Sequence, residues 1–207
     1  MTKPLVSLLT PTFNRRPYFK TLFKCILAQD YPLDRIEWVI GDDGTDKIND
    51  LVDTFKAQGG IKNINYISYE EKLKLGDKRT RIAKAAQGDI LIHIDDDDYY
   101  PPQRVSHAVD VLLTSGKLVA YTPVIHIYFK HIKELRKVGP FPEFCAPEAS
   151  FAYRREVLES ASFSDKDSIG EGVGFLKQCN KSFVELNPRY TMLCFSHDHN
   201  SVPKSYF

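Results

Sequence analysis

Residues 90–98 read ILIHIDDDD, an apolar run that ends in four consecutive aspartates. A short apolar run of this kind is typical of a strand that is buried on both faces of a parallel sheet. Four carboxylates at the end of such a strand repel one another, and a divalent cation that prefers oxygen ligands, Mg²⁺ or Mn²⁺, would relieve the repulsion. A solvated acidic turn is the alternative interpretation. The strand before the run and the YYPP sequence at 99–102 anchor it to the core, which favours a functional site.

Strand-like and helix-like segments alternate on both sides of this run. We expect strands at 6–10, 36–40, 64–69 and 90–94. Apolar residues at helical spacing predict helices within 17–27, 48–55, 77–87 and 105–112. Four such β–α units in about 115 residues favour an α/β fold with a mainly parallel central sheet flanked by helices. The second half is less regular, with a long strand expected at 118–129, a proline-rich loop at 138–150, a helix within 167–178 and short strands near 183–186 and 191–195.

The composition is that of an ordinary globular protein of one domain. The chain has 207 residues, of which 28 are Lys or Arg and 27 are Asp or Glu, so its net charge of +1 gives no electrostatic argument for binding nucleic acid or an anionic membrane.

The four cysteines show no C-x-x-C spacing, which argues against a zinc or redox motif and fits a reducing compartment. No apolar stretch approaches the ~20 residues that span a bilayer, and the first residues lack the features of a signal peptide. We expect a soluble, cytoplasmic protein that would contact a membrane only peripherally.

Polar clusters follow three of the expected strands. They read PTFNR at 11–15, DDGTD at 42–46 and DDDD at 95–98. Because ligands of such sheets bind beyond the carboxyl ends of the strands, we expect these clusters to form one site. The second cluster alone is similar to the D-x-D-G-T loop of haloacid-dehalogenase phosphatases, but Gly41 stands where their nucleophile would be, which excludes that reaction. An EF-hand is excluded as well, because the aspartate run lacks the internal glycine of its loop.

Five segments resemble, in their order and spacing, the motifs of family 2 glycosyltransferases of the GT-A fold, over roughly residues 4–200. Residues 6–15 resemble the family's opening strand and P-T-Y-N-R turn, 40–45 its D-D-G-S segment, 88–90 its G-E-Y-I segment, 95–102 its D-x-D-D-x-x-x-P block, and Arg79 the arginine of its A-R-N helix, with Thr80 in place of the usual Asn. The chain is also similar to small members encoded by large DNA viruses. The resemblance implies one GT-A domain over 1–207, with a nucleotide-binding half at 1–100 and an acceptor-binding and catalytic half at 101–207.

This resemblance implies a metal-dependent enzyme that moves a hexosyl or deoxyhexosyl group from a nucleotide-diphosphate sugar, most commonly a UDP-sugar, to a hydroxyl of a glycan or glycoconjugate. By motif position, the residues at the nucleotide are Pro11, Thr12, Phe13, Arg15, Asp43, Arg79, Asp95 and Asp96. Asp95 and Asp97 are the two acids of the D-x-D motif, and Asp97 would be the principal ligand of Mn²⁺ or Mg²⁺. An H-x-x-N segment near the C-terminus resembles one that returns to the metal in some members of this fold, and we favour His197 over His199 for that contact.

The acceptor hydroxyl must lose a proton during transfer, so a carboxylate base is needed on the other face of the sugar. The resemblance places this base in the segment SIGEG at 168–172, where Glu171 is the candidate. Gly172 stands where the family usually has an Asp, which leaves Asp165, Asp167 and Glu148 as lesser candidates. In-line attack opposite the leaving group would invert the anomeric centre.

Two other functions fit parts of the sequence. A sugar nucleotidyltransferase shares the α/β architecture and the need for a metal, but it carries a glycine-rich N-terminal loop for a triphosphate, and residues 10–16 contain no glycine. A non-catalytic module that binds a nucleotide or a sugar would show tight binding without turnover. Such a module would also be insensitive to replacement of Glu171, which separates it from an enzyme.

Overall fold

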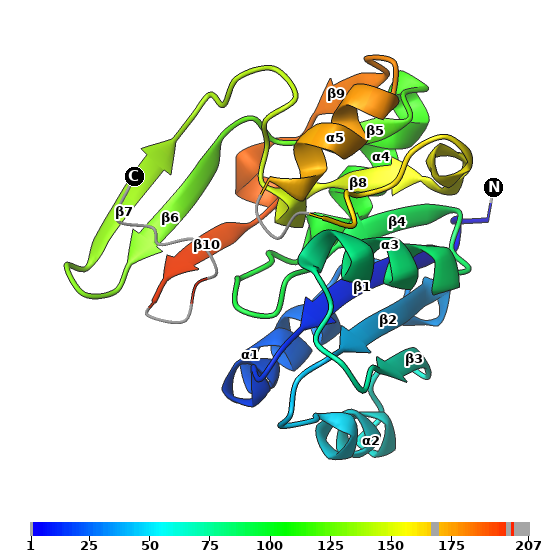
Figure 1. Ribbon diagram of the computed structural model, residues 1–207, viewed down its shortest axis with the longest axis vertical. Coiled ribbons are helices and arrows are strands. Elements are labelled where there is room, and N and C mark those ends of the chain that lie inside the picture. The colour runs from blue at the N-terminus through cyan, green and yellow to red at the C-terminus, as the bar shows by residue number, and fades with distance from the viewer. Residues whose placement is uncertain (1, 167–169, 198–199, 201–207) are drawn as a thin grey trace.

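The computed structural model describes residues 2–166, 170–197 and 200, and it shows a large β-sheet with helices on both faces and a small second sheet at one side (Figure 1). The large sheet has the order β3-β2-β1-β4-β8-β5-β9, with β1 (Val6–Thr12), β2 (Ile36–Asp42), β3 (Asn63–Ser68), β4 (Ile90–His93), β5 (Val119–Tyr121), β8 (Ala152–Arg154) and β9 (Phe183–Glu185). The small sheet has the order β10-β6-β7, with β6 (Ile125–Phe129), β7 (Glu134–Val138) and β10 (Leu193–Ser196). The helices are α1 (Arg16–Leu27), α2 (Asn49–Ala57), α3 (Leu75–Ala85), α4 (Arg104–Ser115) and α5 (Glu171–Gln178).

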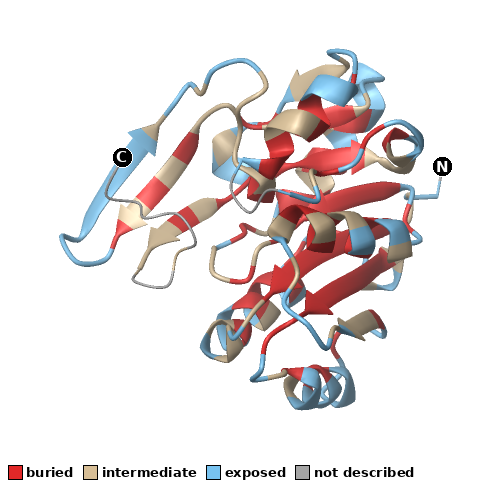
Figure 2. Cartoon of the chain, in the orientation of Figure 1, coloured by how far each residue is buried: buried red, intermediate tan, exposed pale blue. Residues whose placement is uncertain are grey.

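The centre of the large sheet is parallel and covered on both faces. β1 pairs in parallel with β2 and with β4, and every residue of these three strands is buried (Figure 2). Leu8 packs in a hydrophobic cluster with α1, α2 and α4, whereas its neighbour Leu9 packs in a second cluster with α3 and α5. Successive side chains of a strand point to opposite faces, so the helices cover both faces of the sheet. The predicted α/β fold with a mainly parallel, helix-flanked sheet is confirmed.

The prediction of a single long strand at 118–129 is wrong, because this segment forms two strands in different sheets. β5 lies in the large sheet and β6 in the small one. Between them, Pro123 has no N–H to donate to a strand ladder. The hydroxyl of Thr122 donates to the carbonyl of Val124 at 2.6 Å, which closes a turn at this point. The sequence does not predict β7 and β8, because β7 is almost wholly exposed and β8 has only three residues.

The small sheet returns the C-terminal segment to the aspartate run. β10 pairs in parallel with β6, and Leu193 at its start forms a bridge with Tyr99. The two residues exchange backbone hydrogen bonds of 3.0 and 2.9 Å. The end of β10 is thereby fixed beside residues 95–98. Of the helices in the described part of the chain, none is long and apolar enough to cross a membrane.

Candidate functional site

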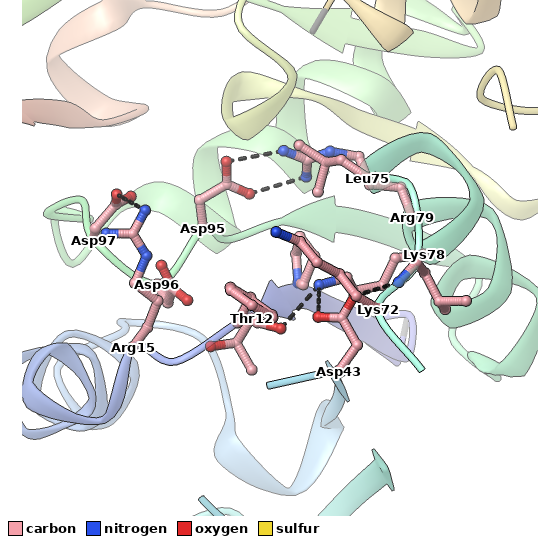
Figure 3. Close-up of a pocket in the computed structure, with 13 residues that line it drawn as sticks. Thr12, Arg15, Asp43, Lys72, Leu75, Lys78, Arg79, Asp95, Asp96 and Asp97 are labelled. Atoms are coloured by element: carbon pink, nitrogen blue, oxygen red, sulfur yellow. Dashed lines mark hydrogen bonds and ion pairs between the residues drawn. The ribbon is translucent and has the colours of Figure 1, made fainter. Parts of the chain in front are cut away.

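A cavity of about 380 Å³ opens at the carboxyl ends of β1, β2 and β4 (Figure 3). Its walls are formed by Pro11, Thr12, Phe13, Arg15, Asp43, Lys72, Leu73, Leu75, Lys78, Arg79, Asp95, Asp96 and Asp97. All eight residues that the motifs assign to the nucleotide belong to this lining. Their functional roles remain predictions, but the three polar clusters meet at one edge of the sheet, as the topology requires.

The first two loops are held together by Asn14. Its backbone has a φ of 54°, in the left-handed region that Asn tolerates better than most residues. In this conformation its Oδ1 accepts the backbone N–H groups of Thr45 and Asp46 at 2.8 and 2.9 Å. The loop after β1 is therefore tied to the loop after β2, and both loops supply residues to the cavity, among them Phe13 and Asp43.

Asp43 is paired with a buried lysine. Nζ of Lys78 donates to Oδ1 of Asp43 and, at 2.9 Å, to the carbonyl of Thr12 (Figure 3). The other oxygen of Asp43 accepts the N–H of Leu73 at 2.8 Å. Burial lowers the pKa of Lys78, and the adjacent carboxylate opposes that effect. The ion pair fixes the direction of the Asp43 side chain at the cavity wall.

Four lining residues are absent from the sequence prediction: Lys72, Leu73, Leu75 and Lys78. They come from the start of α3 and the loop before it, where no motif marks them. Of these four, only Lys78 has a sequence signal that could have indicated a place in the site, because it directly precedes Arg79 on the same helix. Of the lesser candidates for the base, Asp165 lines a different pocket, and Asp167 lies outside the described residues.

The four consecutive aspartates have four different environments. Asp95 accepts two hydrogen bonds from Arg79, both of 2.9 Å, so its charge is already paired. Asp96 is 7% exposed, and burial, followed by the charge of Asp97, raises its pKa well above the usual range. Asp98 does not line the cavity, and its Oδ1 accepts a backbone N–H of β10 at 3.2 Å. These differences separate residues that look equivalent in the sequence.

Asp97 faces the C-terminal segment. Its Oδ2 lies 3.1 Å from Nε2 of His197, which is 100 residues further along the chain. The imidazole is held from its other side, where Nδ1 lies 3.2 Å from the hydroxyl of Tyr18. The backbone N–H of His197 donates to Oδ1 of Asn200 at 2.8 Å, within the H-x-x-N segment. The H-x-x-N segment therefore lies against the aspartate run, and its role at a metal stays a prediction.

A divalent cation fits the chemistry of this pair. Oδ2 of Asp97 and Nε2 of His197 offer a carboxylate oxygen and an imidazole nitrogen that can reach one ion. In the chain as described, no group of three or more His, Cys, Asp or Glu side chains is arranged to hold a metal, and Asp95, the other expected ligand, is bound by Arg79. Mg²⁺ is usually held by one or two carboxylates together with substrate phosphates, so a bound donor would complete the site. His199 lies outside the described residues.

Arg79 is the centre of a buried polar network. Its Nε donates to Oε1 of Glu171 at 2.9 Å, while its two terminal nitrogens hold Asp95. Its Nη1 also donates to Nδ1 of His93 at 2.9 Å, because burial lowers the pKa of that histidine well below the usual range and leaves the ring neutral. Glu171, the first residue of α5, is 2% exposed and lies behind the cavity wall that Arg79 forms.

A second carboxylate, Glu148, lies beside Glu171. It begins a short 3-10 turn (Glu148–Ser150), and its Oε1 accepts the N–H of Gly172 at 2.9 Å. Burial and then the charge of Glu171 raise the pKa of Glu148 to about 7, and Arg79 opposes them in part. Two carboxylates and one arginine therefore lie together at the start of α5.

The raised pKa of Glu148 predicts a pH dependence of stability. The folded protein keeps a proton on this carboxyl up to about pH 7, whereas the ordinary pKa is 4.5. A group of this kind contributes stability at low pH and loses it as the pH rises through the folded-state pKa. Replacing Glu148 by Gln, which does not ionise, should raise the melting temperature relative to wild type at about pH 8 and change it little at about pH 5. Thermal denaturation at both pH values measures the effect, and a difference that does not vary with pH contradicts the raised pKa.

Comparison with known proteins relates this site to one family. The model of the family described as glycosyl transferase family 2 matches residues 7–162. Among relatives, the putative teichuronic acid biosynthesis glycosyltransferase TuaG of Bacillus subtilis is 26% identical over 121 residues, which cover 58% of this chain and 46% of TuaG. The poly(ribitol-phosphate) beta-N-acetylglucosaminyltransferase TarS of Staphylococcus aureus is 28% identical over 135 residues, which cover 60% of this chain and 23% of TarS. The chain thus matches less than half the length of either relative.

Solved structures share the fold. The crystal structure of S. aureus TarS 1–349 has a TM-score of 0.74 at 19% identity, and the match covers 92% of this chain and 60% of that one. The same protein in complex with UDP-GlcNAc gives a TM-score of 0.72 over 94% of this chain and 59% of TarS 1–349. The mannosyltransferase PcManGT of Pyrobaculum calidifontis, in complex with GDP-Man and Mn²⁺, gives 0.66 at 19% identity over 99% of this chain and 59% of its own. The expected GT-A fold is confirmed by these likenesses.

Proposed function

This chain belongs to glycosyl transferase family 2, and from that premise we propose that it transfers a hexosyl or deoxyhexosyl group from a nucleotide-diphosphate sugar to a hydroxyl group of a glycan. The observation that carries the proposal is the cavity at the ends of β1, β2 and β4, where the eight expected nucleotide-site residues meet. A UDP-sugar is the favoured donor, because TarS, which has the same fold, binds UDP-GlcNAc. GDP-mannose, bound by the Pyrobaculum protein, is the second choice.

The donor nucleotide would lie across the first two loops. The ring of Phe13 offers a face on which a base can stack, and Nζ of Lys72 lies 4.1 Å from the ring centroid. Asp43 is held by Lys78 and by a backbone N–H, and its oxygens keep capacity to accept a further hydrogen bond from a base or a ribose. Arg15 lines the cavity next to Asp97 and supplies positive charge for the diphosphate.

The cation that such a donor requires would be held by Asp97 and His197. When bound, it supplies a positive charge that stabilises the departing nucleoside diphosphate. An imidazole ligand beside a carboxylate suits Mn²⁺ as well as Mg²⁺. Asp95 remains a candidate ligand from the D-x-D motif, although Arg79 holds its carboxylate in this structure.

Transfer exchanges one bond at the anomeric carbon for another. The acceptor oxygen forms a bond to this carbon while the bond to the diphosphate oxygen breaks, and the electron pair leaves with the diphosphate. The proton of the acceptor hydroxyl passes to a carboxylate of the protein. Attack from the face opposite the leaving group inverts the configuration, and the carboxylates at the start of α5 are the candidates for the proton acceptor, with Glu171 the one expected from the sequence.

The proposal is tested by ligand-dependent stability and then by turnover. UDP, GDP, CDP and TDP are each added with Mn²⁺ or with EDTA, and the melting temperature is recorded. A ligand at about 100 times its Kd should add ~2.7 kcal/mol of stability. Of these combinations, we expect only UDP together with Mn²⁺ to give this stabilisation. UDP-GlcNAc, UDP-glucose, UDP-galactose and GDP-mannose then serve as donors, with release of the nucleoside diphosphate as the readout. Binding without turnover of any donor would identify a non-catalytic module and overturn the proposal.

His197 provides a separate prediction about the metal. Replacing it by Ala removes the imidazole beside Asp97, and the Mn²⁺ concentration needed for half-maximal stabilisation by UDP should rise by roughly tenfold or more. His131, which is exposed, provides the matched control, and its Ala variant should titrate like wild type. An unchanged Mn²⁺ titration in the His197 variant would remove this residue from the metal site.

A further inference from the structure

Gly172 leaves a space at the start of α5 that a side chain from another element occupies. A Cβ added at this glycine would lie 2.8 Å from both Cγ and Oε1 of Glu148 and 3.0 Å from Cε2 of Phe151. Real Cβ atoms essentially never show contacts as short as the two to Glu148, so a side chain at 172 would require Glu148 to move from its present position. The carboxylate of Glu148 therefore stands where a side chain of residue 172 would begin, and the N–H of Gly172 holds it there at 2.9 Å.

The two carboxylates at this point differ in their availability to a substrate. Glu171 is 2% exposed, and Nε of Arg79 donates to it at 2.9 Å. A carboxylate neutralised by a guanidinium is a weak proton acceptor, because the arginine stabilises its charged form. Glu148 is only partly buried, and the donor to its Oε1 is a neutral backbone N–H. An acceptor hydroxyl can therefore reach Glu148 more readily than Glu171.

We propose that Glu148 is the general base that accepts the proton of the acceptor hydroxyl, and that Glu171 is a positioning residue that orients Arg79. This inference rests on the proposed function. The O–H bond of the acceptor breaks as its oxygen bonds to the anomeric carbon, the proton moves to Oε of Glu148, and the electron pair of the old glycosidic bond leaves with the diphosphate. The assignment of this role to Glu171 from the sequence remains the competing prediction.

The electrostatic surroundings support this assignment. The charged groups that act on Glu148 are Glu171, which raises its pKa, and Arg79, which lowers it, and burial has the largest effect. The resulting pKa of about 7 lies close to neutral pH, where a general base combines a large deprotonated fraction with high proton affinity. Arg79 also holds Asp95 by hydrogen bonds, so one guanidinium acts on the donor side of the cavity and, through its charge, on Glu148.

The experiment compares Glu148→Gln with Glu171→Gln, using the nucleotide sugar that wild type turns over in the donor series above and measuring release of the nucleoside diphosphate. Gln keeps an oxygen that can accept the N–H of Gly172, so the first variant should fold and bind UDP with Mn²⁺ as wild type does. We expect its kcat to fall by about 10²–10⁴-fold. Wild type should gain activity as the pH rises through about 7, and this gain should be lost in the variant. Glu171→Gln should keep an activity increase with pH, displaced to lower pH, because it removes the charge that raises the pKa of Glu148.

Controls separate the base from a structural role. Glu143→Gln changes an exposed glutamate that forms an ion pair with Lys181, and it should behave like wild type. The exchange variant Glu148→Gly with Gly172→Glu returns a carboxylate to the same space from α5, and it should be at least tenfold more active than Glu148→Gly alone. Wild-type turnover and pH profile in Glu148→Gln would overturn the inference and leave the proposed function intact. Absence of turnover in wild type with every donor would instead overturn the proposed function, and the inference with it.

Discussion

An Asp97→Asn variant is expected to lose the metal-dependent binding of UDP, with an affinity in the presence of Mn²⁺ that is lower by roughly 100-fold, or ~2.8 kcal/mol. The expectation follows from the different environments of the four aspartates. The charge of Asp95 is paired with Arg79, and a raised pKa favours the neutral form of Asp96. Asp97 is the one whose carboxylate combines a place in the cavity wall with the imidazole of His197. Asn keeps the shape of the side chain but removes the negative charge that a cation requires.

The thermal shift caused by UDP with Mn²⁺, compared with UDP and EDTA, measures this loss. Asp98→Asn is the matched control on the next residue, since its Oδ1 accepts the N–H of Phe195 and an amide oxygen can do the same. We expect the control to keep the full Mn²⁺-dependent shift. If Asp97→Asn keeps it too, the charge at Asp97 is not what holds the cation, and the metal assignment fails.

The position of the cavity could be predicted from the sequence because it depends on local patterns. Apolar strands that end in polar clusters mark their own carboxyl ends, and a parallel sheet brings those ends to one edge. Residues 11–15, 42–46 and 95–98 therefore meet in the structure as expected. The return of His197 to this edge of the sheet has another basis, since only the resemblance to the family indicates it, and that resemblance predicts a contact with the metal, not with Asp97.

The parts that the sequence did not predict depend on contacts without periodicity. Pro123 shows where a strand must stop, but not that the chain then crosses to a second sheet. Lys78 pairs with Asp43, which is 35 residues earlier in the chain, and no pattern in either segment predicts the pair. The packing of Glu148 against Gly172 is of the same kind, because it joins a 3-10 turn to a helix start that is 24 residues away. Such pairs are set by three-dimensional packing, so only a structure distinguishes Glu148 from the other acidic candidates.

Arg79→Met should produce the largest loss of stability among single substitutions in the site. The side chain of Arg79 is 3% exposed, and it satisfies Glu171, Asp95 and the neutral ring of His93 at once. Methionine fills much of the same volume, but it leaves the Glu171 carboxylate without its cation, and this carboxylate is only 2% exposed. Removing one partner of a buried ion pair costs ~3–5 kcal/mol, because the remaining charge stays out of water without compensation. That loss is a large part of the ~5–15 kcal/mol that stabilises a typical domain.

Urea denaturation of wild type and variant near neutral pH gives the two free energies of unfolding. Arg81→Met provides the control on the same helix, since Arg81 is 52% exposed and pairs with Asp77 at the surface, where such a pair contributes only ~0.2–1 kcal/mol. The double variant Arg79→Met with Glu171→Met should recover part of the loss, because it removes a buried charge together with its partner. A loss in Arg79→Met no greater than in Arg81→Met would mean that the network contributes little to stability. The network would then serve to orient Asp95 and Glu171, and its charges would matter to the reaction rather than to folding.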